Sequence, residues 1–166
     1  MMSGRKLLIG TIAIVIAAVG WYAFRPELLF VNKTVNEAFP SAQSASAGNA
    51  PKAISAGHFH GVAHETKGTA TIYRLSDGKQ VLRLMDFQTS NGPDVHVYLV
   101  AAPDASDNAT VKNAGFVDLG SIKGNEGDQN YDLPAGIDLN KYQAVTIWCA
   151  RFGVNFATAP LARNNS

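Results

Sequence analysis

The single cysteine of this 166-residue chain is the side chain with the widest choice of chemistry. Cys149 could act as a redox thiol, a metal or haem ligand, or a nucleophile, and each role needs the thiolate that a nearby cation, helix N-terminus or metal favours. Arg151 follows closely, whereas Trp148 and Phe152 make the neighbourhood apolar. A buried structural cysteine is the alternative, and both interpretations stay open.

Two histidines one residue apart are the second candidate site. His58 and His60 fall on a predicted strand at 57–63, where residues i and i+2 face the same side. They could hold a metal ion together, with His64 near the following turn. Two exposed histidines flanking a buried Phe59 explain the same spacing without a metal.

The remaining titratable residues form weaker patterns. His96 is open to the same two interpretations, a ligand or an ordinary imidazole. Four acidic residues in predicted loops would bind calcium only if they converged, and no Asp-x-Asp-x-Asp-Gly loop is present, so solvated turns are the simpler account. These residues are Asp104, Asp107, Glu126 and Asp128.

The motifs of familiar catalysts and electron carriers are absent. A blue-copper site would require a His and a Met in the loop after Cys149, and neither residue follows it. There is no Cys-x-x-Cys or Cys-x-x-Cys-His, and no Gly-x-Ser-x-Gly elbow. The chain is therefore predicted to lack conventional catalysis of its own, and whether it is an enzyme stays open.

Short strands must position these residues. From Gly57 onward, β-branched and aromatic runs alternate with turn residues about every ten positions, which is typical of all-β proteins. The predicted fold is one small sandwich or Greek-key barrel of about eight mostly antiparallel strands. The strands are predicted near 57–63, 68–75, 80–87, 94–101, 115–120, 129–133, 143–150 and 153–158, with a long loop at 102–114.

Alternation within two of these strands assigns their faces. In an extended chain every second side chain points the same way, so one set on each strand faces the core. The predicted core-facing residues are Val95, Val97 and Leu99 on one strand, and Val145, Ile147 and Cys149 on the other.

The N-terminal region predicts a membrane anchor. Leu7 to Phe24 is a run of 18 uncharged residues, enough at about 1.5 Å per residue to cross most of a hydrocarbon core of about 30 Å. Basic residues precede the run and Trp21 and Tyr22 close it, which predicts a cytoplasmic N-terminus and a periplasmic or extracellular C-terminal domain. A cleaved signal peptide, with a shorter apolar core, is the competing interpretation.

These patterns divide the chain into five regions. Residues 26–40 are mixed in character and could extend the helix or pack loosely, whereas residues 41–55 are small and polar and cannot bury enough apolar area to order the chain. The regions are a cytoplasmic N-terminus at 1–5, a transmembrane signal-anchor helix at 6–25, a flexible linker at 26–56, the β domain at 57–162 and a tail at 163–166.

Charge excludes one class of partner. Residues 55–166 carry nine basic and eleven acidic side chains without a basic cluster. Nucleic-acid binding depends on such a cluster to displace counterions, so no nucleic-acid partner is expected.

Three blocks of sequence together resemble the DM13 domain. They are Asp86 to Leu99 (DFQTSNGPDVHVYL), Leu119 to Pro134 (LGSIKGNEGDQNYDLP) and Tyr142 to Leu161 (YQAVTIWCARFGVNFATAPL). Their order and spacing, with the Trp148-Cys149 pair, carry the resemblance, which spans about Gly57 to Leu161.

The resemblance implies a β-rich extracytoplasmic module that takes part in electron transfer or oxidative modification. It assigns the family's characteristic cysteine to Cys149, acting bare or through a prosthetic group such as haem. The chain has no attached cytochrome or oxidase domain, so a separate redox protein is the expected partner. The alternative is a non-catalytic binding or structural module of the cell envelope, meeting a protein or polysaccharide through its loops.

Overall fold

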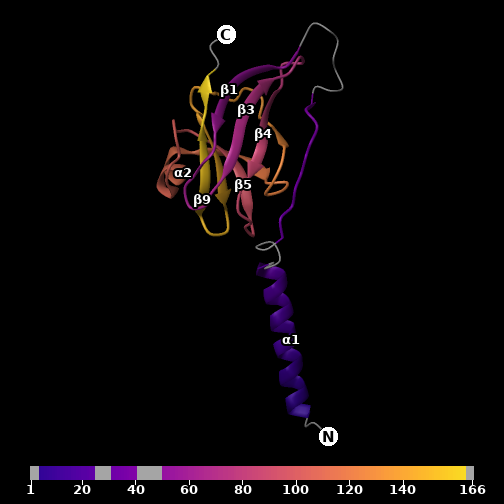
Figure 1. Ribbon diagram of the computed structural model, residues 1–166. Coiled ribbons are helices and arrows are strands. Elements are labelled where there is room, and N and C mark those ends of the chain that lie inside the picture. Colours follow the sequence, from indigo (N-terminus) through magenta and orange to yellow (C-terminus); the bar gives the residue numbers. More distant parts are fainter. Residues whose placement is uncertain (1–3, 25–30, 41–49, 164–166) are drawn as a thin grey trace.

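The computed structural model describes residues 4–24, 31–40 and 50–163, and shows a helix followed by a β-sandwich (Figure 1). The chain runs in the order α1 (Gly4–Phe24), β1 (Lys52–His58), β2 (His60–Gly61), β3 (Lys67–Arg74), β4 (Gln80–Gln88), β5 (Val95–Val100), α2 (Asn108–Ala114), β6 (Phe116–Ser121), β7 (Gln129–Asp132), β8 (Ala144–Cys149), β9 (Val154–Pro160) and β10 (Ala162–Arg163).

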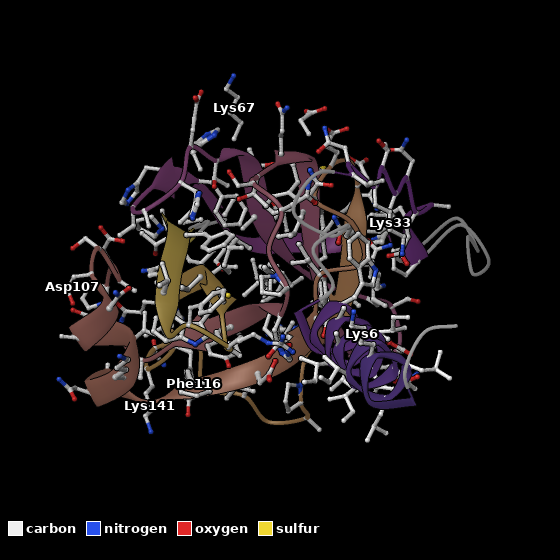
Figure 2. All side chains as sticks on the ribbon, turned by 90° about the horizontal axis from the view of Figure 1, so that it is seen from below. Lys6, Lys33, Lys67, Asp107, Phe116 and Lys141 are labelled. Atoms are coloured by element: carbon white, nitrogen blue, oxygen red, sulfur yellow. The ribbon has the colours of Figure 1, made fainter. Side chains whose placement is uncertain are left out.

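The strands form two five-stranded antiparallel sheets, in the orders β10-β1-β3-β4-β7 and β2-β9-β8-β5-β6. Lys67 of the first sheet and Phe116 of the second lie at opposite sides of the domain (Figure 2). The all-β prediction is confirmed, as a sandwich. Two short strands, β2 and β10, add to the predicted eight, and the first strand begins at Lys52 rather than at 57.

The core between the sheets follows the predicted alternation. Val97 pairs with Ile147 and Leu99 with Val145 across β5 and β8, and all four are fully buried. Removing this apolar surface from water is the main term that holds the two sheets together.

The outer face of the second sheet is also covered, by α2. The predicted loop at 102–114 therefore contains a helix, although its sequence carries a start signal: Asp107 accepts a hydrogen bond from Thr110 N at 2.6 Å. Val111 of α2 is fully buried in a second cluster with Tyr98 and Trp148. Both faces of β5 and β8 are thus packed.

Residues 31–40 dock on the domain, and we call this segment the strap. Val35 N donates to Glu126 O and Glu37 N to Asp128 O, both at 2.9 Å. The prediction of a flexible linker at 26–56 is therefore wrong for 31–40, and also for 52–56, which lie in β1. The rest of that predicted linker, apart from residues 50 and 51, lies outside the described residues.

Helix α1 has apolar side chains on all sides, and Ile14 is 70% exposed. Within the three described segments, no helix meets the length and hydropathy expected of a membrane span. Residues 1–3 of the predicted cytoplasmic N-terminus, residue 25 at the end of the predicted anchor and residues 164–166 of the predicted tail lie outside the described residues. Residue 163 belongs to β10 rather than to a free tail.

Candidate functional site

Cys149 is the last residue of β8 and lies in the main core. It pairs with Val95 of β5 and Val154 of β9, and it is fully buried. The prediction that it faces the core is confirmed. Arg151, the cation near it in sequence, lies in the exposed turn that follows β8. A reagent in solution can therefore reach the thiol only if the core opens.

This position does not fit a haem at Cys149. An axial ligand must have open space on the side where the planar macrocycle sits, whereas this cysteine has no exposed surface and belongs to a close-packed apolar cluster.

His58 and His60 do not share one strand. His58 ends β1 in the first sheet, and His60 begins β2 in the second. The chain crosses between the sheets at Phe59, whose buried ring packs against Phe87 with ring centroids 5.4 Å apart. The premise of a common strand face for the two imidazoles is therefore wrong.

The other parts of the predicted metal sites are also separated. His60 Nε2 lies 3.2 Å from Asp104, and the His64 ring packs on Phe156 at 4.0 Å. Asp107 caps α2. Among residues 4–24, 31–40 and 50–163, no group of three His, Cys, Asp or Glu side chains is arranged to hold a metal ion.

The remaining two acidic loop residues bind other partners. Asp128 pairs with Arg83 at 2.6 Å, and Glu126 accepts hydrogen bonds from the strap residues Asn32 and Thr34. The convergence that calcium would need does not occur.

His96 is held between two carboxylates. Its Nδ1 lies 3.0 Å from Asp118 and its Nε2 3.1 Å from Asp94. Partial burial lowers the pKa of the imidazole, but hydrogen bonds and charge attraction from both aspartates outweigh it, so the pKa is raised. The Asp94-x-His96 spacing could have indicated one of these contacts, whereas Asp118 reaches His96 only through the pairing of β5 with β6.

A row of aromatic rings lies on the outer face of the second sheet, on strands β5, β6 and β8. Tyr98 stacks on Phe116 with centroids 4.2 Å apart and planes within 2°, and lies 6.2 Å from Trp148. Phe116 is 45% exposed, whereas the other two rings are buried. We call these three residues the aromatic row. It runs from the surface (Figure 2) to the backbone that carries Cys149 on the opposite side of the sheet.

Comparison with known families matches residues 58–161 to DM13, described as electron transfer DM13. The matched segment covers the sandwich from the end of β1 to the end of β9, and the chain belongs to this family. No curated protein and no solved structure matches the chain.

Proposed function

We propose that this protein is a membrane-attached module that passes single electrons between partners outside the cytoplasm, and that the aromatic row is its route. The observation that carries the proposal is the stack of Phe116 and Tyr98 at 4.2 Å, which links the surface to Trp148. Electronic coupling falls steeply with distance, so rings in contact conduct better than separated ones.

The transfer leaves the domain unchanged. An oxidised acceptor docked at Phe116 takes one electron from the Trp148 indole across the intervening rings, which leaves an indole radical cation. A reduced donor then returns one electron, so the donor is oxidised, the acceptor is reduced, and no bond forms or breaks.

The acceptor must be a strong oxidant, such as a peroxide-activated haem in a separate protein. Indole yields electrons only to strong oxidants, and Lys112 Nζ lies 5.9 Å from the Trp148 ring centroid. This ammonium group favours the neutral ring over its radical cation.

In this proposal Cys149 packs the core beneath the row. The prediction that Cys149 is itself the redox group stays a prediction, and its burial means that any electron would have to reach the sulfur through the sheet.

Rapid mixing of the full chain in detergent with hexachloroiridate(IV), a one-electron oxidant, tests the route. All variants carry Trp21→Phe, so that Trp148 is the only tryptophan. We expect Trp148→Phe to remove the fast phase and Lys112→Gln to accelerate it, with no change in Cys149→Ala or in the control Tyr142→Phe. Loss of the fast phase in Cys149→Ala, with its retention in Trp148→Phe, would assign the transfer to the thiol.

Membrane attachment is supported by the exposed apolar side chains of α1 and the uncharged run from Leu7 to Phe24. We expect the full chain to stay with membranes in alkaline carbonate, and the β domain to be digested by protease added to intact spheroplasts. Release by carbonate would contradict attachment, and protection from protease would contradict the external location.

A second function, a binding or structural module of the envelope, is favoured by the sealed position of Cys149. If the protein is a binding or structural module, both Cys149→Ala and Trp148→Phe should fully complement a strain that lacks the protein. If it transfers electrons along the aromatic row, Trp148→Phe should not complement that strain.

A further inference from the structure

A cavity of about 380 Å³ opens at one end of the sandwich, and no residue of the aromatic row lines it. It lies where β1 and β4 begin and β3 ends, beside β10 and the loop at 137–140. Its polar and charged lining comprises Lys52, Ser55, Arg74, Gln80, Asp138, Asn140 and Arg163, while Ile54, Ile137 and Leu139 supply apolar walls. The volume falls in the range of about 300–1,000 Å³ typical of small-molecule sites.

Strand pairing brings three cations to this cavity on the inner side of the first sheet. Lys52 lies directly opposite Arg74, and Ser55 lies opposite both Arg163 and Ile72. Ile72 is a fully buried core residue two positions before Arg74, so Arg74 shares its inward face. An irregularity at Ile54 keeps Lys52 and Ser55 on this face.

The three basic residues of the lining, Lys52, Arg74 and Arg163, are exposed to solvent. The cavity lining contains three basic residues and one acidic residue, Asp138, so its net charge favours an anion.

The floor of the cavity offers unused hydrogen-bonding groups. Ser55 is only 3% exposed, and its hydroxyl has no hydrogen-bond partner among the described residues. The side-chain carbonyl of Gln80, which faces Arg74 across β3 and β4, is buried and equally unpartnered. Buried polar groups are normally paired, because leaving one unpaired costs about 1–3 kcal/mol.

We propose that this cavity binds a small hydroxylated carboxylate of the uronic-acid kind. The Arg74 and Arg163 guanidinium groups pair with the carboxylate, with Lys52 adding positive charge. The Ser55 hydroxyl donates to a ligand oxygen, and the Gln80 carbonyl accepts from a ligand hydroxyl. A ligand must therefore carry both a negative charge and a hydroxyl donor to complete the site.

The inference goes beyond electron transfer and does not rest on it, since none of its residues belongs to the aromatic row. A loss of electron transfer in Trp148→Phe leaves this site intact, and a loss of ligand binding leaves the row intact.

Calorimetric titration of the full chain in detergent with D-glucuronate, acetate and D-glucose tests the site. We expect glucuronate to bind more tightly than acetate, which has the carboxylate but no hydroxyl donor, and glucose not to bind. Equal affinity for glucuronate and acetate would overturn the requirement for a hydroxyl donor, and binding of glucose as tight as glucuronate would overturn the requirement for charge. No heat with glucuronate would overturn the proposal.

Variants assign the contacts. Arg74→Gln and Arg163→Gln should each weaken glucuronate binding by about tenfold or more, and Ser55→Ala by a smaller factor. Lys67→Gln, at the opposite end of β3 from Arg74, is the matched control and should bind unchanged. Unfolding curves check that each variant is folded, and unchanged affinity in both folded arginine variants would contradict the site.

Discussion

Lys123 Nζ lies 2.8 Å from both carboxylate oxygens of Glu37, joining the strap to the sandwich. The same carboxylate accepts a hydrogen bond from Asn130 N at 2.7 Å. Arg83 completes the contact by donating to Glu37 O at 3.1 Å and to Asp128 at 2.6 Å. The strap is thus held by charge-assisted hydrogen bonds, which are stronger than neutral ones.

Replacing Glu37 by Ala should lower the free energy of unfolding by about 1 kcal/mol near neutral pH, a modest value because both ion-pair partners are partly exposed. Urea titrations of the full chain in detergent measure the change. Glu65→Ala, which removes an exposed pair with Lys67, is the control and should have almost no effect. Equal losses in the two variants would contradict a specific role for Glu37.

The effect of Glu37 should depend on pH. Desolvation raises the pKa of its carboxyl group, but the hydrogen bonds from Lys123 and Asn130 and the charges of Lys123 and Arg83 outweigh this, so the pKa is lowered. A lowered folded-state pKa gives stability that is present above the ordinary value of 4.5 and is lost as the pH falls through the folded pKa. The difference between wild type and Glu37→Ala should shrink between pH 5 and about pH 3; a constant difference would contradict this linkage.

Replacing Gly124 by Ala should displace the strap. A Cβ at this position would collide with Lys33 O and lie 2.9 Å from Val35 Cγ2. Hydrogen exchange of the full chain should then show faster exchange of the Val35 and Glu37 amides, both of which are protected by backbone bonds in the native fold. Amides of β8 serve as the internal control. Unchanged protection of both strap amides would show that the strap tolerates the extra methyl group.

The imidazole of His96 should titrate above its ordinary pKa of 6.5. A raised folded-state pKa gives stability that is fully present below 6.5 and is lost as the pH rises through the folded value. Asp118→Asn removes one carboxylate and should move the titration, followed by NMR of the ring protons, to lower pH. A midpoint unaffected by this substitution would contradict the contact at 3.0 Å.

The thiol of Cys149 should react with an aromatic disulfide reagent only as fast as the core opens. The side chain is fully buried, so its labelling rate should rise with denaturant in parallel with unfolding. Cys149→Ala should cost about 1–2 kcal/mol through the lost sulfur contacts, and Cys149→Ser more, because it buries a hydroxyl. Rapid labelling in native conditions would instead restore Cys149 as an accessible redox group.

Period-two alternation predicted much of the core, because a strand's two faces are a local property. Val97 and Ile147 could be assigned to the core from their own strands, and so could Cys149. The position of α2 was missed although Asp107 signals a helix start, because a seven-residue helix is stabilised mainly by packing its buried Val111 on the sheet.

Longer-range features needed the tertiary structure. The sequence placed His58 and His60 on one strand, yet the chain passes from the first sheet to the second between them, at Phe59. The strap is mixed in polar and apolar residues, and it reads as linker because its partners lie about ninety positions further along, as with Lys33 N and Asn125 at 2.7 Å.

From its residues alone, the chain determines an apolar N-terminal run, a set of short strands and a core-facing thiol, since each depends on neighbours within a few positions. Only the folded sandwich decides that Lys52 lies opposite Arg74 near Ser55, whose hydroxyl has no partner among the described residues, and that Tyr98 joins Phe116 to Trp148. These groups are far apart in sequence, and the register between strands, which depends on packing of the whole domain, brings them together.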